Sequence, residues 1–109
     1  MVLAAEKIFE RQIKTYLAEH GAYHVKYFAN GYTKRGIPDI LACVNGHFVG
    51  IEVKAQRGRP SDLQILNVRR IREAGGIAFV LYPSGFEKFK HFIHGLNCGR
   101  IEEMDIEVR

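Results

Sequence analysis

Several features that mark common functional classes are missing from this chain. Its longest apolar runs are far too short to span a bilayer, and its first residues lack the apolar core of a signal peptide, so we expect no membrane partner. It also has no phosphate-cradling P-loop, dinucleotide fingerprint or serine elbow. We therefore expect no nucleotide cofactor.

Cysteine is scarce as well. Cys43 and Cys98 are too few to form a disulfide framework, which favours a reduced cytoplasmic setting, in a prokaryotic or phage-infected cell. The length of 109 residues, without repeats or low-complexity tracts, predicts a single domain. We expect its core over about residues 4–96 and an acidic extension over residues 97–109.

A predicted β-hairpin organises the chain. Asn45-Gly46 separates two β-rich runs and favours a type I′ turn, because both central residues of that turn need a positive φ. In a two-residue loop Val44 faces His47, so the numbers of paired residues sum to 91. This register fixes which side chains share a face of the hairpin.

That register places two acids opposite each other. Asp39 and Glu52 would face one another with Cβ atoms roughly 4.5–5.5 Å apart, and Lys54 would point to the same face. Opposed like charges destabilise a sheet, so we expect a divalent cation held by oxygen ligands to neutralise them. The alternative is a solvated hairpin with incidental charges and a register shifted by a bulge.

Hydrophobic periodicity predicts the other elements. They are helices over residues 3–20, 61–74 and 86–96, and strands over 23–29, 40–44, 47–54 and 77–82. The order α-β-β-β-α-β-α predicts an α/β fold with a mixed β-sheet flanked by helices. Residues 101–109 are either a short strand or a partner-binding extension. His91, His94 and Cys98 lack a recognised zinc spacing, so we expect surface histidines.

Positive charge is concentrated in the middle of the chain. Residues 34–72 hold eight basic and three acidic side chains, whereas the last nine residues hold one basic and four acidic. A basic surplus around the hairpin favours a polyanion such as nucleic acid, and a solubilising surface is the alternative. The candidate contacts to a nucleic-acid backbone are Lys34, Arg35, Arg57, Arg59, Arg69 and Arg70.

The residues with the most specific pattern are Pro38-Asp39, Glu52-Val53-Lys54, Glu6 in the first helix, and Ser61 to Gln64 at the start of the second helix. The first two resemble the PD-(D/E)XK nuclease signature. With the others, over about residues 4–82, the pattern is similar to the VRR-NUC (virus-type replication–repair nuclease) branch. The resemblance implies a restriction-endonuclease-like core and a stand-alone endonuclease acting on branched DNA, such as four-way (Holliday) junctions, as a homodimer.

Phosphodiester hydrolysis suits these residue types. It needs a nucleophilic water, a neutralised phosphate and a stabilised leaving oxygen, and one or two Mg²⁺ or Mn²⁺ ions can serve all three needs. Asp39 and Glu52 would be the metal ligands, joined by the backbone carbonyl of Val53. Lys54 would face the scissile phosphate or orient the attacking water.

Two further candidates have structural explanations too. Glu6 lies along the apolar stripe of its helix, either as an acid favoured by the helix dipole or, as the resemblance implies, as a third acid that binds the metal or orients a water on it. Glu10, one turn later, is the competing choice. Gln64 completes a capping box with Ser61, and the resemblance implies that it also supports the active site.

Two other functions stay open. One is a non-catalytic nucleic-acid-binding module of the same fold, which metal-dependent turnover would exclude. The other is a dimerising accessory protein that uses its acidic tail, and salt-sensitive DNA binding would argue against it.

Overall fold

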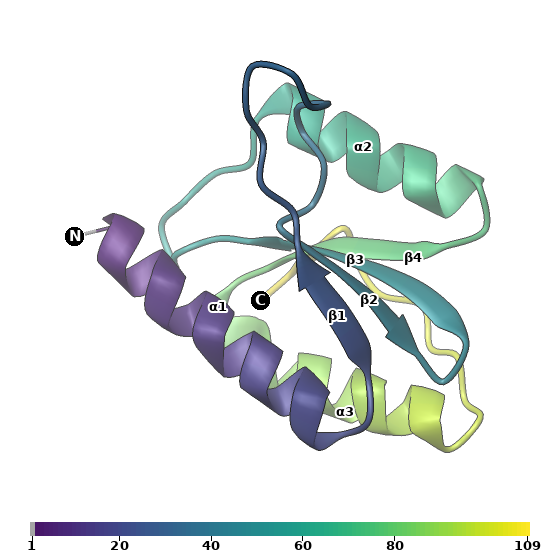
Figure 1. The fold of residues 1–109 in the computed structure, drawn as a ribbon. Helices are drawn as coiled ribbons and strands as arrows, with labels where there is room; N and C mark the ends of the chain where they lie inside the picture. Colours follow the sequence, from purple (N-terminus) through teal and green to yellow (C-terminus); the bar gives the residue numbers. More distant parts are fainter. Residues whose placement is uncertain (1) are drawn as a thin grey trace.

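A five-stranded β-sheet lies between α1 and α3 on one face and α2 on the other (Figure 1). The computed structural model describes residues 2–109. Its elements are α1 (Val2–Glu19), β1 (Tyr23–Lys26), β2 (Ile40–Val44), β3 (His47–Val53), α2 (Asp62–Glu73), β4 (Ile77–Leu81), a 3₁₀ turn (Pro83–Gly85), α3 (Phe86–Asn97) and β5 (Glu107–Val108). None of the helices described is both long and apolar enough to cross a bilayer.

The strands follow their sequence order across the sheet. β1, β2 and β3 pair antiparallel, whereas β3, β4 and β5 pair parallel. Helix α2 connects the parallel strands β3 and β4, as parallel strands require a crossover. The predicted α/β fold, a mixed sheet flanked by helices, is confirmed.

The β2–β3 hairpin has the predicted turn and register. Asn45 has φ 48° and Gly46 has φ 85°, so both central residues adopt the positive φ of a type I′ turn. Pairing runs continuously from Val44 with His47 to Ile40 with Ile51. β2 therefore begins directly after Asp39, and β3 continues past Ile51 to Glu52.

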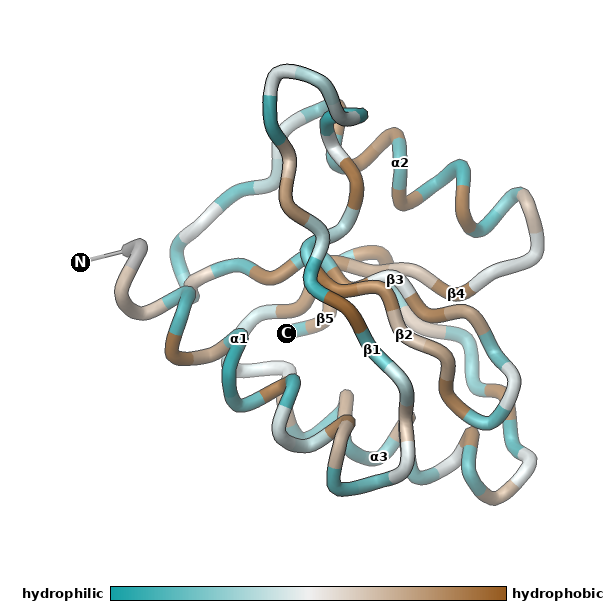
Figure 2. Tube along the Cα trace, viewed as in Figure 1, coloured by the Kyte–Doolittle hydropathy of each residue, from teal (hydrophilic) through white to brown (hydrophobic). Residues whose placement is uncertain are grey.

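Two apolar clusters hold the sheet. On one face, side chains of α1 and α3 such as Leu17 and Phe89 pack against strand residues that include Ile51. On the other face, Val68 of α2 packs with Val80 and its neighbours. Figure 2 shows hydrophobic segments running along the strands between these helices. As a result, every residue of β3 from 49 to 53 is buried.

Strand β1 is shorter than predicted, ending at Lys26 and not at residue 29. The Tyr27 amide still donates to the Asp39 carbonyl at 2.8 Å, but Phe28 is 73% exposed. Beyond Tyr27 the chain leaves the sheet for the loop that leads to β2. An extended loop can have the same alternating sequence as a strand. The predicted strand therefore extended beyond the observed end of β1.

The acidic tail, residues 101–109, contains a short strand, which was one of the two alternatives that its sequence left open. β5 pairs with the edge of β4, Val80 with Glu107 and Leu81 with Val108. Arg72 of α2 donates from Nε to the Ala78 carbonyl (2.8 Å) and from Nη2 to the Met104 carbonyl (2.6 Å). The arginine therefore ties the tail to α2 and β4.

Candidate active site

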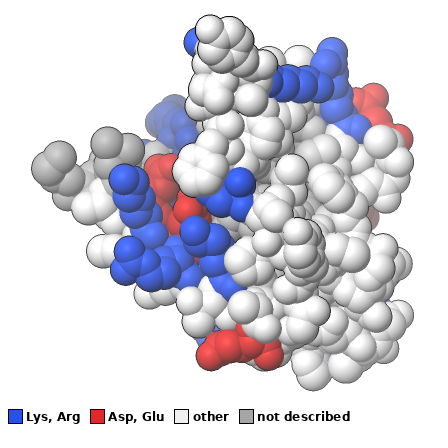
Figure 3. Space-filling model, viewed as in Figure 1, with Lys and Arg blue, Asp and Glu red and all other residues white. Residues whose placement is uncertain are grey.

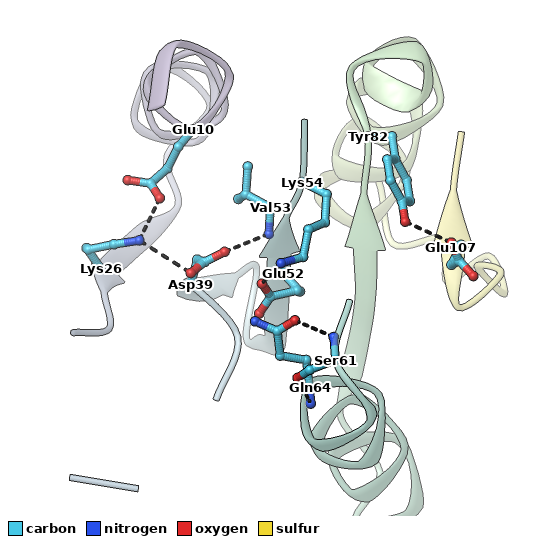
Figure 4. A network of polar contacts seen from close by, with 10 residues as sticks. All are labelled: Glu10, Lys26, Asp39, Glu52, Val53, Lys54, Ser61, Gln64, Tyr82 and Glu107. Atoms are coloured by element: carbon cyan, nitrogen blue, oxygen red, sulfur yellow. Dashed lines mark hydrogen bonds and ion pairs between the residues drawn. The ribbon is translucent and has the colours of Figure 1, made fainter. Parts of the chain in front are cut away.

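The predicted site residues meet at the end of the sheet where β2 begins and β3 ends (Figure 4). Asp39 Oδ2 accepts a hydrogen bond from the Val53 amide at 2.9 Å, which fixes this carboxylate beside the last residues of β3. Lys54 Nζ lies 3.5 Å from Glu52 Oε2. The hairpin thus brings Asp39, Glu52 and Lys54 together, as the register predicts.

Glu52 is unusual because it is a charged residue type inside a buried strand. It is 1% exposed, and its Oε1 atom has no hydrogen-bond partner among the described residues. Burial, followed by repulsion from Asp39 and hydrogen bonding with it, raises the pKa of Glu52 to about 9, although Lys54 opposes the shift. An unpartnered buried carboxylate oxygen is costly, so this atom calls for a ligand.

The two acids of α1 are placed differently. Glu10 Oε1 accepts from Lys26 Nζ at 2.6 Å, and the same nitrogen lies 3.4 Å from Asp39 Oδ1. Glu6 is half-buried. Burial raises its pKa, with Lys54 and the Ala55 amide opposing and Asp39 reinforcing the shift. Glu6 is therefore near enough to Asp39 and Lys54 for their charges to act on it, whereas Glu10 contacts Lys26.

Lys26 was not among the residues singled out from the sequence. Although burial opposes it, the hydrogen bond to Glu10 and the nearby Asp39 raise the pKa of this lysine. Its position in β1 turns it toward α1, and the alternation of that strand was the available signal. Only the tertiary fold shows that it lies between two acids.

Gln64 keeps its structural role and also lies close to the site. Its Oε1 accepts from the Ser61 amide at 2.8 Å, and Ser61 Oγ accepts from the Gln64 amide at 3.1 Å, which confirms the capping box. Figure 4 shows this first turn of α2 on the same side of β3 as Glu52 and Lys54. A site role for Gln64 stays a prediction.

The donor chemistry fits a hard divalent cation. Asp39 and Glu52 offer carboxylate oxygens, one of them unpartnered, and such ligands suit Mg²⁺ or Mn²⁺. Among the described residues, no three His, Cys, Asp or Glu side chains are grouped closely enough to hold a metal on their own. Any cation here would therefore complete its shell with backbone carbonyls, water or substrate, as Mg²⁺ commonly does.

The histidines of α3 contact side chains on or after the same helix. His91 Nε2 lies 3.3 Å from Glu102 Oε1, and His94 Nε2 lies 3.6 Å from Cys98 Sγ. These are surface contacts, and the described residues form no group of three metal-ligating side chains here. The expectation of surface histidines agrees with this arrangement.

The predicted nucleic-acid contacts lie on three exposed segments. Lys34 and Arg35 are on the β1–β2 loop, Arg57 and Arg59 are on the connector after β3, and the third pair, Arg69 with Arg70, is on α2. Arg57 and Arg59 share a pocket with Arg109, which sequence reasoning missed. Figure 3 shows Lys and Arg atoms around the acidic atoms beside α1, and a charge-free surface over β1 and β2.

A mixed sheet with an aspartate directly before one strand, a buried glutamate in the next strand and a lysine directly after it defines a PD-(D/E)XK-type nuclease. Residues 4–82 match the model of a family described as archaeal Holliday junction resolvase (Hjc). The chain belongs to this family. The assignment confirms the nuclease class of the sequence resemblance, and the VRR-NUC branch stays a prediction.

A solved structure has a fold similar to that of this chain. The Hjc Holliday junction resolvase of Archaeoglobus fulgidus, an archaeal hyperthermophile, superimposes with a TM-score of 0.55 and 24% sequence identity. The match covers 70% of this chain and 66% of the Archaeoglobus chain. The comparison with curated proteins gave no match.

Proposed function

We propose that this chain is a metal-dependent endodeoxyribonuclease that cuts branched DNA, in particular four-way junctions. The observation that carries the proposal is the unpartnered Oε1 of buried Glu52, placed beside Asp39 and Lys54 in a chain of the Holliday junction resolvase family. Burying a carboxylate oxygen without a partner is energetically costly, and a dication site would supply the missing partner. The VRR-NUC resemblance is a narrower proposal about the branch, and it rests on Glu6 and Gln64.

In this proposal Asp39 and Glu52 would hold Mg²⁺ or Mn²⁺ with the Val53 carbonyl as a further ligand, and Glu6 would act on the cation through a water that it orients. The cation would neutralise charge on the scissile phosphate and make a water nucleophilic. Lys54, fixed 3.5 Å from Glu52, would place its ammonium against the phosphate or orient the attacking water. Binding of the DNA backbone falls to the exposed basic segments that surround this end of the sheet.

The test is cleavage of a four-way junction, a flap and a linear duplex with common arm sequences, with and without Mg²⁺. We expect the junction to be cut preferentially, and Glu52→Gln or Lys54→Ala to lower the rate by roughly 10²–10⁴-fold while junction binding persists. Cleavage by either variant at the wild-type rate would refute the site. Equal cutting of the linear duplex would refute the junction preference.

Glu6 and Glu10 form a matched pair for the third acid. Glu6→Gln should slow cleavage by roughly tenfold or more, because this acid faces Asp39 and Lys54. Glu10→Gln should mainly lower stability, since Glu10 binds Lys26. The reverse order of effects on cleavage would assign the third acid to Glu10.

We also propose that two copies associate through the open face of β1 and β2. α2 covers most of β3 and β4 and leaves part of this face of the sheet open. The exposed side chains there are Tyr23 (74% exposed), Val25 (42%), Phe48 (47%) and Cys43. Figure 3 shows this surface without charged side chains. A single candidate site per chain also requires a second copy if two strands of a junction are to be cut.

Sedimentation of Val25→Asp and Phe48→Asp variants tests this face. Both should be monomeric where the wild type is dimeric, because a buried charge at an apolar interface is strongly unfavourable. Ile8→Asp is the control, since Ile8 is 57% exposed on α1, across the sheet. A monomeric wild type, or dissociation by Ile8→Asp alone, would rule out this interface.

A further inference from the structure

A pocket of about 770 Å³ lies along the connector that follows β3. Its charged lining consists of Arg57, Arg59, Arg109 and Glu107. Three guanidinium groups therefore face a single carboxylate, which leaves an excess of positive charge. Guanidinium forks match the geometry of phosphate oxygens, so this lining selects for a phosphate group.

The connector joins the pocket to the candidate active site. Gly58 lines the pocket, and its amide donates to the Ala55 carbonyl at 2.8 Å in a tight turn. A Cβ atom added at Gly58 would lie 3.4 Å from Cδ of Lys54. The wall of the pocket at Gly58 thus lies close to the side chain of Lys54, the lysine of the candidate active site.

Arg109 is held in place by buried structure. Its guanidinium carbon lies 3.8 Å from the centre of the Tyr82 ring, and its Nη2 lies 3.3 Å from Glu107 Oε1. The same Oε1 accepts from the Tyr82 hydroxyl at 2.8 Å, a contact drawn in Figure 4. Since Tyr82 is fully buried, β5 presents Arg109 from a rigid support.

These last residues lie beyond the region that the family model matches, which ends at residue 82. We infer that the pocket binds a backbone phosphate of the DNA next to the scissile one, and that β5 supplies Arg109 as one of its ligands. The inference rests on the proposed function. Glu107 orients Arg109 directly and also by fixing Tyr82, and its negative charge opposes the phosphate.

Opposite effects of two variants test the inference. Junction binding is measured in EDTA over a range of salt concentrations. Arg109→Gln should weaken binding and lower the slope of log K against log salt by about one, so that its deficit shrinks roughly threefold to fourfold between about 50 and about 200 mM salt. Glu107→Gln keeps an acceptor for Tyr82 and removes the opposing charge, so it should bind junctions more tightly.

Arg100→Gln is the matched control, because Arg100 is an exposed arginine of the tail outside the pocket lining. Arg109→Gln with the slope of Arg100→Gln would overturn the inference. Weaker binding by both pocket variants would also overturn it, since that result assigns the pair a purely structural role. If the wild type cuts junctions in either case, the proposed function stands.

A second measurement separates DNA from free phosphate. The amide resonances of Gly58 and Val108 should shift on adding a short duplex at micromolar concentration, and inorganic phosphate should shift them only weakly. Saturation by inorganic phosphate with no response to DNA would identify a small-anion pocket and refute the inference. Failure of the wild type to bind or cut any junction would instead refute the proposed function.

Discussion

Replacing Glu52 by glutamine should change how stability depends on pH. The folded protein raises the pKa of this carboxyl from 4.5 to about 9, chiefly through burial. Between these values the folded state holds a proton that the unfolded state has released. Stability contributed by this group is therefore present at low pH and is lost as the pH rises toward 9.

The size of the effect follows from the width of that window. Each pH unit inside it is worth about 1.4 kcal/mol, so raising the pH from about 5.5 to about 8 should cost the wild type about 3 kcal/mol through Glu52 alone. Glutamine has nearly the same shape and does not titrate. The stability of Glu52→Gln relative to the wild type should therefore increase by about 3 kcal/mol over this range.

Urea unfolding followed by circular dichroism at both pH values, in EDTA, measures this difference. The comparison of wild type and variant cancels the titration of groups that do not interact with Glu52. A difference in unfolding free energy that is the same at both pH values would refute the assigned burial and pKa. Adding Mg²⁺ should reduce the pH dependence of the unfolding free energy of the wild type and not that of Glu52→Gln, because a cation favours the ionised carboxylate.

Three other substitutions probe the supports of the site. Gly36→Ala should lower the unfolding free energy by about 2–4 kcal/mol, because φ is +79° and the new Cβ would lie 2.6 Å from Cγ of Leu63; unchanged urea midpoints would contradict this. Gly85→Ala should push β5 outward, since its Cβ would clash with the Val108 carbonyl; junction binding should then show the salt slope of Arg109→Gln, and a wild-type slope would argue against it. Lys26→Met removes the positive charge between Glu10 and Asp39, so calorimetry should show tighter Mn²⁺ binding. Urea unfolding should show a loss of about 1–3 kcal/mol in unfolding free energy. Weaker Mn²⁺ binding would count against this arrangement.

The hairpin could be predicted because its determinants are local. Asn45 and Gly46 dictate the turn, the turn dictates the register, and the register carries Asp39 to Glu52 and Lys54. The capping box of α2 is equally local, since Ser61 and Gln64 are three residues apart. Patterns of this kind need no knowledge of the tertiary fold.

The missed features all depend on contacts between distant segments. Arg109 becomes part of a pocket only because β5 pairs with β4, and a two-residue strand has too little pattern to predict that pairing. Lys26 is an ordinary strand lysine until α1 places Glu10 beside it. The burial of Glu52 likewise requires both faces of the sheet to be covered, which no hairpin pattern specifies.

The position of β3 explains why Glu52 is buried at an energetic cost. β3 is the one strand of the described sheet that pairs antiparallel on one side and parallel on the other, so its end is enclosed by β2, β4 and both helix layers. An acid there is excluded from water, and Lys54 at 3.5 Å offsets its charge only in part. Exclusion of water strengthens electrostatic attraction, so the burial that destabilises Glu52 alone would also make its pull on a dication stronger. Stability lost without the cation and affinity gained with it are consequences of the same placement.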